Sequence, residues 1–156
     1  MDGLMWAPFI AACVHITEEF FIPGGFEKWY RSYRPDPSRI TRRFLAIVNG
    51  LLLVVCVNIA FLGRIPLGIA YWLAISALLF SNGIWHAWAS YKSRSYSPGV
   101  VTGMGIYVPL GAYGYVYFVG TGAVSIGTAA IAGLIGGSYQ IWSATYHRRR
   151  VKKAAG

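Results

Sequence analysis

Three ionisable side chains lie close together in an apolar run near the N-terminus. In FIAACVHITEEFFIPGG, residues 9–25, His15 is followed by Glu18 and Glu19. Residues three and four positions apart on a helix share one face, so the imidazole can meet both carboxylates. The chain has only 5 acidic residues in all. Because ionisable groups inside a membrane are strongly disfavoured, two acids in an apolar run indicate a functional site.

These residue types support three kinds of chemistry. The side chains that could hold one divalent transition metal, zinc or iron, are His15, Glu18, Glu19 and the later His86. Two acids are few for two metals, so a mononuclear site is the more economical hypothesis. Without a metal, Glu18 and a histidine could act as an acid–base pair in an isomerase or cyclase. The same groups could also relay protons in a carrier or channel.

The composition places these residues in a membrane protein. The chain has 156 residues, is 56% hydrophobic and 12% charged, and has a mean hydropathy of +0.49. Its formal net charge of +9 could suggest nucleic acid as a partner. The basic residues, however, lie in short clusters between long apolar runs and form no basic face with interleaved aromatics. We therefore exclude nucleic acid as a partner.

The elements that position the site are predicted to be membrane-spanning helices. A helix needs about 20 residues to cross the hydrocarbon core, and five segments qualify: roughly 4–22, 43–62, 66–89, 98–119 and 122–146. The sequence thus predicts an all-α polytopic protein, with a five-helix transmembrane domain at residues 1–147 and a basic cytoplasmic tail at residues 148–156.

The basic residues predict the orientation of these helices. Every lysine and arginine except Arg64 lies after the first, third or fifth segment. Because cytoplasmic loops carry the positive charge, this pattern predicts an N-terminus outside and a cytoplasmic C-terminus. The start, Met1-Asp2-Gly3-Leu4, lacks the basic region of a signal peptide, so we expect the first segment to stay in the protein.

This topology places the polar residues of several spans at one depth, toward the cytoplasmic leaflet. His15, Glu18 and Glu19 lie in the last third of the first span, and His86 lies near the inner end of the third. We expect these four to be the catalytic residues of a polar site inside the bundle. The residues expected to position a substrate there are Asn49, Asn82 and Tyr96.

Small residues at a spacing of four recur in the fourth and fifth segments. They form Gly99-x-x-x-Gly103 and Gly133-x-x-x-Gly137. Such spacing lets helix backbones approach closely, so we interpret both pairs as packing faces within the bundle.

A family resemblance covers most of residues 9–105. The run His15-Ile16-Thr17-Glu18-Glu19, followed by FFIPGGFEKWY, resembles the signature of the HXXEE-motif proteins, small bacterial integral-membrane proteins. Further matching positions are Asn49, NGIWH at 82–86 and YSPGVVTG at 96–103. The resemblance implies a multi-span protein of the bacterial inner membrane and implies no particular activity. The architecture is also similar to that of sterol-isomerase-like membrane proteins, an analogy of fold alone.

We therefore expect a multi-pass enzyme of the inner membrane that acts on a hydrophobic or lipid-like small molecule. Its expected cofactor is one divalent metal, zinc or iron, and its expected partners are membrane lipids and copies of itself in a homo-oligomer. A proton-coupled carrier or channel, a metal-free isomerase or cyclase, and an assembly subunit remain alternatives.

Overall fold

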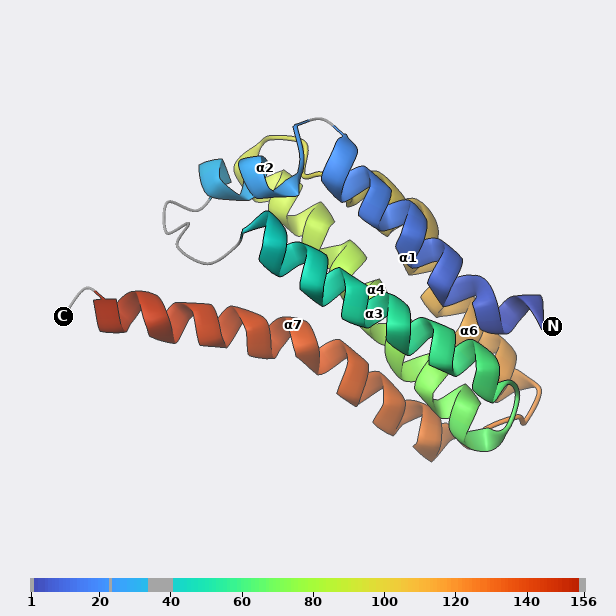
Figure 1. Cartoon of the computed structure of the whole chain (residues 1–156). Helices are drawn as coiled ribbons and strands as arrows, with labels where there is room; N and C mark the ends of the chain where they lie inside the picture. The colour runs from blue at the N-terminus through green and yellow to red at the C-terminus, as the bar shows by residue number, and fades with distance from the viewer. Residues whose placement is uncertain (1, 23, 34–40, 155–156) are drawn as a thin grey trace.

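Every regular element among residues 2–22, 24–33 and 41–154, which the structure describes, is helical. The structure is a computed structural model, and from residue 143 onward it describes only the course of the helix. The elements in chain order are α1 (Gly3–Phe21), α2 (Phe26–Tyr33), α3 (Arg42–Leu62), α4 (Pro66–Ser93), α5 (Val100–Thr102), the π-helix η1 (Gly103–Tyr107), α6 (Val108–Gly120) and α7 (Ile126–Ala154). The all-α prediction is confirmed (Figure 1).

Three of these helices, α1, α3 and α4, are long and apolar enough to cross a membrane. This finding agrees with a membrane protein. The expected span 98–119 is divided into α5, η1 and α6 instead of forming one α-helix. The expected span 122–146 corresponds to the first part of α7, which starts at Ile126. Helix α7 continues to Ala154 and so includes most of the expected tail, residues 148–156. The side chains of that basic tail lie outside the described residues, as do Arg34 and Arg39.

Helix α3 exposes most of its apolar side chains. Only 11% of the most apolar stretch of α3 is buried, whereas 44% of the corresponding stretch of α4 is buried. Large exposed side chains along it include Ile47, Leu51, Val54 and Phe61. An apolar face of this extent is unfavourable in water and is compatible with surrounding lipid.

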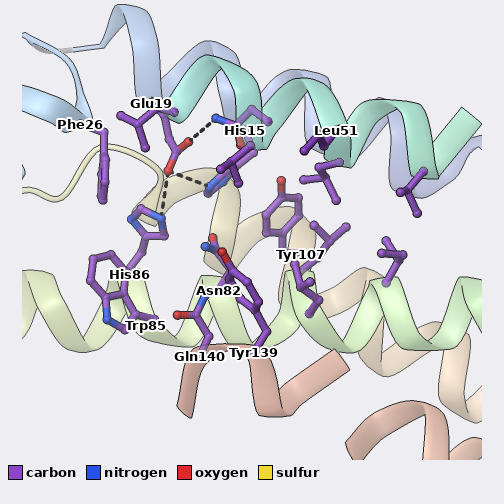
Figure 2. A pocket seen from close by; sticks show the side chains of 18 of the residues that line it. His15, Glu19, Phe26, Leu51, Asn82, Trp85, His86, Tyr107, Tyr139 and Gln140 are labelled. Carbon is purple, nitrogen blue, oxygen red and sulfur yellow. Dashed lines mark hydrogen bonds and ion pairs between the residues drawn. The ribbon is translucent and has the colours of Figure 1, made fainter. Parts of the chain in front are cut away.

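Helix α4 is the central helix, and α1, α3, η1, α6 and α7 all pack against it (Figure 1). Pro66 at its start suits the first turn of a helix, where no backbone N–H is required. Near its other end, His86 and Asn82 project toward α1 (Figure 2).

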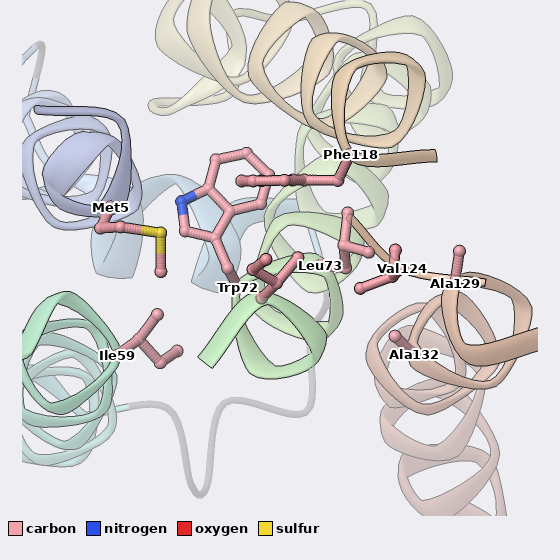
Figure 3. Packing of buried hydrophobic residues seen from close by; sticks show 9 residues of the cluster. Met5, Ile59, Trp72, Leu73, Phe118, Val124, Ala129 and Ala132 are labelled. Carbon is pink, nitrogen blue, oxygen red and sulfur yellow. The ribbon is translucent and has the colours of Figure 1, made fainter. Parts of the chain in front are cut away.

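The main apolar core lies at the opposite end of α4 from His86. Trp72 is its largest member and is fully buried beside Phe118, Met5 and Ile59 (Figure 3). The Trp72 indole donates a hydrogen bond of 2.9 Å to the Leu4 carbonyl, so its polar atom is satisfied. His86 lies fourteen positions after Trp72, which is about 21 Å along a helix. The core can therefore hold the bundle together without filling the polar site.

An ion pair closes the bundle at this apolar end. Arg64, in the turn between α3 and α4, binds the Asp2 carboxylate and donates a 2.8 Å hydrogen bond to the Tyr117 hydroxyl. The hydrogen bond from Arg64 lowers the pKa of Asp2 below its usual value. Arg64 was the one basic residue that the charge pattern placed outside, and the structure pairs its charge with Asp2.

Close helix approaches occur at glycines, although not at every expected one. Gly103 lies against the backbone of Gly83, which confirms the predicted packing role of Gly103. In α7 the closest approach is made by Gly136, not by the expected pair: a Cβ at Gly136 would lie 1.9 Å from the Ala74 carbonyl oxygen. Gly137 faces open space, so the prediction for Gly137 is wrong. A shift of one residue moves a position about 100° around a helix, beyond the accuracy of a spacing rule.

Replacing Gly136 with alanine should lower the unfolding temperature of the detergent-solubilised protein, because the methyl group would force α7 away from α4. Overpacking of this kind costs about 1–3 kcal/mol. The matched control is Gly137→Ala, whose methyl group meets nothing within 4 Å and should leave the temperature unchanged or raised. Equal unfolding temperatures for both variants, measured by circular dichroism, would contradict the α4–α7 packing.

Candidate functional site

Three segments bring the predicted site residues together. The last two turns of α1 carry His15, Glu18 and Glu19, and the late part of α4 carries His86. After α4 the chain turns back so that α5 and η1 lie against both helices. All four ionisable residues are buried, with no more than 7% of any of them exposed.

Two imidazoles converge on one carboxylate oxygen. Nε2 of His86 lies 3.3 Å from Oε1 of Glu19, and Nε2 of His15 lies 3.7 Å from the same oxygen (Figure 2). The three ligand atoms lie within 4.8 Å of one another. Ligands bound at 2.0–2.1 Å to a tetrahedral zinc ion are separated by about 3.3 Å. His15, Glu19 and His86 could therefore hold one metal ion after a small contraction.

Hydrogen bonds place a proton on Nδ1 of the His15 ring. The Thr102 hydroxyl donates to Oε2 of Glu18 at 2.5 Å, so toward His15 it can only accept. Nδ1 of His15, 2.8 Å from that hydroxyl, must then carry the ring proton. Nε2 of His15 faces Glu19, and in the neutral ring this nitrogen carries the lone pair.

The His86 ring has a similar arrangement. Its Nδ1 lies 3.0 Å from the hydroxyl oxygen of Ser97, which is fully buried. Among the described residues, Nε2 of His86 and Nε2 of His15 are buried atoms without a hydrogen-bond partner. Both rings therefore use one nitrogen for a hydroxyl and turn the other toward Glu19.

Glu18 lies apart from this trio and binds the start of α5. Its carboxylate accepts hydrogen bonds from the backbone N–H groups of Val101, at 3.2 Å, and Thr102, at 2.8 Å. The Thr102 and Tyr96 hydroxyls donate to it as well. A carboxylate is favoured at a helix N-terminus because the unpaired N–H groups there carry partial positive charge. The geometry therefore leaves Glu18, which we predicted as a metal ligand, outside the group formed by His15, Glu19 and His86.

The three residues expected to position a substrate have different surroundings. Burial, together with the Glu18 carboxylate, raises the pKa of Tyr96 to about 12, so this hydroxyl stays a donor to Glu18. The Asn49 amide donates at 3.3 Å to Oε2 of Glu19. The Asn82 oxygen is buried without a hydrogen-bond partner among the described residues, and Asn82 lines the cavity beside the site. Asn82 is therefore the best placed of the three to contact a ligand.

A cavity of about 370 Å³ adjoins the two histidines. The site forms its polar wall, and apolar side chains of α3 and α4, such as Leu52, Val55 and Leu79, form most of the remainder. Tyr139 and Gln140 of α7 complete it opposite α3 (Figure 2). This volume is in the range of small-molecule sites, so a hydrophobic molecule could lie with its polar end at the histidines.

From the sequence we assigned no role in the site to four residues that shape it: Ser97, Gly99, Thr102 and Tyr107. The Tyr107 ring stacks on His15 at a centroid distance of 4.3 Å. Gly99 has a φ of +101°, and a Cβ there would lie 2.7 Å from the His86 ring and 2.9 Å from the His15 ring. Gly99 thus contacts the imidazoles instead of forming the expected helix-packing face. The signal in the sequence was the small and polar run SPGVVTG within a hydrophobic segment.

Comparison with known protein families finds a match. The model of a family described as a protein of unknown function with HXXEE motif matches residues 6–114. The chain belongs to this HXXEE family. The matched range contains every residue of the His15, Glu19 and His86 trio and ends before α7. Comparison with curated proteins and with solved structures finds no match.

The structure separates the roles of the family's namesake residues in this HXXEE protein. His15 and Glu19, at the two ends of the motif, face His86. Glu18, between them, turns toward α5. Adjacent helical residues point about 100° apart, so two neighbouring glutamates serve two different neighbours.

Proposed function

We propose that this HXXEE protein is an integral-membrane enzyme that uses one divalent metal, zinc or iron, to act on a hydrophobic or lipid-like small molecule. The metal ligands in this proposal are His15, Glu19 and His86. The observation that carries it is the convergence of two buried Nε2 atoms on a carboxylate oxygen.

A cation between these atoms would resolve an otherwise unfavourable contact. When the His15 ring is neutral, its Nε2 lone pair and the Glu19 carboxylate are both electron-rich, and neither brings a proton to the other. Buried polar atoms without partners are costly. Two histidines and one carboxylate also leave coordination positions open for water or substrate. A metal bound there would supply a Lewis acid at the polar end of the cavity.

The residues around the trio would tune and orient it. Thr102 and Ser97 hold the Nδ1 atoms of the two histidines, and Asn49 holds the second oxygen of Glu19. Such outer hydrogen bonds orient metal ligands and keep the correct ring nitrogen available. Asn82 would orient the polar group of the substrate, and the apolar lining would bind its hydrophobic part.

The proposal includes the bacterial inner membrane and five crossings, with the N-terminus outside. The continuous helical run 100–120 and helix α7 would be the fourth and fifth spans beside α1, α3 and α4. The basic residues support this orientation, because in it Arg64 would be the one basic residue on the outer side. The positive charge of Arg64 is also offset by its ion pair with Asp2. The site would then lie toward the cytoplasmic leaflet, and access from lipid would run between α3 and α7.

Elemental analysis of the purified protein, prepared without chelator, tests the proposal. We expect about one zinc or iron ion per chain, and loss of that metal in His15→Ala, His86→Ala and Glu19→Gln, because three ligands are needed to hold the ion tightly. The matched control is Asn58→Ala. It removes a polar side chain of α3 whose hydrogen bond, among the described residues, is to the Val54 carbonyl of the same helix.

Metal near background in folded wild-type protein would overturn this proposal. It would leave the metal-free acid–base enzyme or the proton-coupled carrier as the explanation of the trio. If Asn58→Ala lost as much metal as the three ligand variants, the loss would be explained by damaged folding. That result would also count against a metal site at His15, Glu19 and His86.

A further inference from the structure

A second cavity, of about 270 Å³, lies where α1, α2 and α3 meet. Lys28, Arg31 and Arg42 contribute to its wall together with the glycines of the α1–α2 turn. It shares Glu19, Phe26 and Leu45 with the first cavity. The two cavities therefore adjoin at a carboxylate that the proposed function uses as a metal ligand.

The charge of the second cavity is positive. Arg31 forms a 2.8 Å ion pair with Glu27, so these two charges offset each other. Lys28 and Arg42 have no carboxylate partner among the described residues. The guanidinium of Arg42 instead lies 5.9 Å from the centre of the Phe20 ring. The wall thus carries three cations, Lys28, Arg31 and Arg42, against the two carboxylates Glu19 and Glu27. The net charge is positive, which favours an anionic group.

The backbone keeps the wall of this cavity free of further side chains. Gly24 and Gly25 have φ values of +78° and +83°, a conformation that residues with a Cβ seldom adopt. These residues turn the chain from α1 into α2, which carries Lys28 and Arg31. The same turn places the cations next to the end of α1, where Glu19 lies.

The two adjoining cavities differ in the chemistry of their walls. The first is lined mainly by apolar residues of α3 and α4, such as Leu52 and Leu79, and the second by Lys28 and Arg42. An elongated molecule lying across both would have its charged end at the cations and its apolar end between α3 and α7. Its head–tail junction would lie beside Glu19.

We propose that the substrate is a single-chain amphiphile with an anionic head group of the phosphate type. This inference rests on the proposed function for the reaction site, although binding of such a molecule can be measured separately. A volume of about 370 Å³ lies near the lower end for ligand sites, which favours one apolar chain over two. Arginine and lysine are the side chains that bind phosphate oxygens most strongly.

The test uses the full chain in nanodiscs of uncharged phosphatidylcholine and radiolabelled dodecyl phosphate as the probe. We expect saturable binding above that of empty nanodiscs. Unlabelled dodecyl phosphate should compete at least tenfold better than inorganic phosphate, which has no tail, or dodecanol, which has no charge. The Lys28→Ala/Arg42→Ala double variant should raise Kd at least tenfold, since charge-assisted hydrogen bonds are among the strongest polar contacts.

The matched control is Lys92→Ala, which removes a basic residue of the last turn of α4 that lines neither cavity and should change Kd less than twofold. Equal competition by dodecanol, equal competition by inorganic phosphate, or an unchanged Kd in the double variant would each overturn the inference. Metal without dodecyl phosphate binding would remove this inference and leave the proposed function. Binding of dodecyl phosphate to a protein without metal would overturn the proposed metal enzyme and leave this inference standing.

Discussion

Replacing Glu18 with glutamine should lower both the unfolding temperature and the metal content of the purified protein, although Glu18 is not among the proposed ligands. Its carboxylate accepts four hydrogen bonds, two from backbone N–H groups of α5 and two from the hydroxyls of Thr102 and Tyr96. An amide has one acceptor oxygen and turns an NH₂ group toward donors. Losing two charge-assisted bonds costs roughly 3–5 kcal/mol.

The effect on metal follows from the hydrogen-bond chain Glu18–Thr102–His15. Without the carboxylate, the Thr102 hydroxyl is free to donate to Nδ1 of His15, and the ring proton then moves to Nε2. A protonated Nε2 cannot bind a metal ion. Elemental analysis at a temperature where the variant is folded would measure this loss separately from unfolding.

The control for Glu18 is Glu27→Gln in α2. Glu27 forms one partly exposed ion pair with Arg31, and pairs of this kind contribute about 0–1 kcal/mol. We expect its unfolding temperature and metal content to match those of the wild type. If Glu18→Gln also matched the wild type in both measurements, Glu18 would not organise α5 or His15.

Replacing Gly99 with alanine should have the second large effect, because it adds a methyl group between the two imidazoles. The new Cβ would lie 2.7 Å from Cε1 of His86 and 2.9 Å from Cε1 of His15, at a φ of +101°. Backbone strain and overpacking each cost about 1–3 kcal/mol. We expect a loss of roughly 2–5 kcal/mol in the free energy of unfolding and the loss of bound metal.

Two other glycine-to-alanine variants separate the causes of this effect. Gly105, in η1, has ordinary backbone angles, and an added Cβ would meet nothing within 4 Å, so Gly105→Ala should be close to neutral. Gly122 has a φ of +71° and open space, so Gly122→Ala should lose about 1–2 kcal/mol while keeping its metal. Metal retained in Gly99→Ala would show that the imidazoles tolerate displacement and would contradict the geometry of the trio.

The sequence predicted that the residues of the proposed metal site would lie near one another. His15 and Glu19 are four residues apart, so helix periodicity alone places them on one face. Charge placement put His86 at the same depth, and the structure has it 3.3 Å from Glu19. The separate role of Glu18 could not be predicted, because it depends on Thr102, which is 84 residues away in the chain. Periodicity describes contacts within one helix and carries no information on such a partner.

The fold shows the same limit. Hydropathy identified α1, α3 and α4 to within a few residues, because apolar length is what a membrane span requires. It could not predict that the next segment contains a π-helical turn, since hydropathy depends on composition and not on the hydrogen-bond pattern of the backbone. That turn begins at Gly103, where the backbone touches Gly83 of α4. A close contact between two helices therefore coincides with the change in the backbone hydrogen-bond pattern.

The π-helical turn also limits how sequences of this family can change in length. A π turn holds one residue more than the α turn it replaces, and each helical residue rotates the chain by about 100°. Losing one residue from Gly103–Tyr107 would turn either Thr102 away from Glu18 or Tyr107 away from His15. Single-residue insertions and deletions should therefore accumulate in the connecting loops during evolution, while selection on the site preserves the length of this helix.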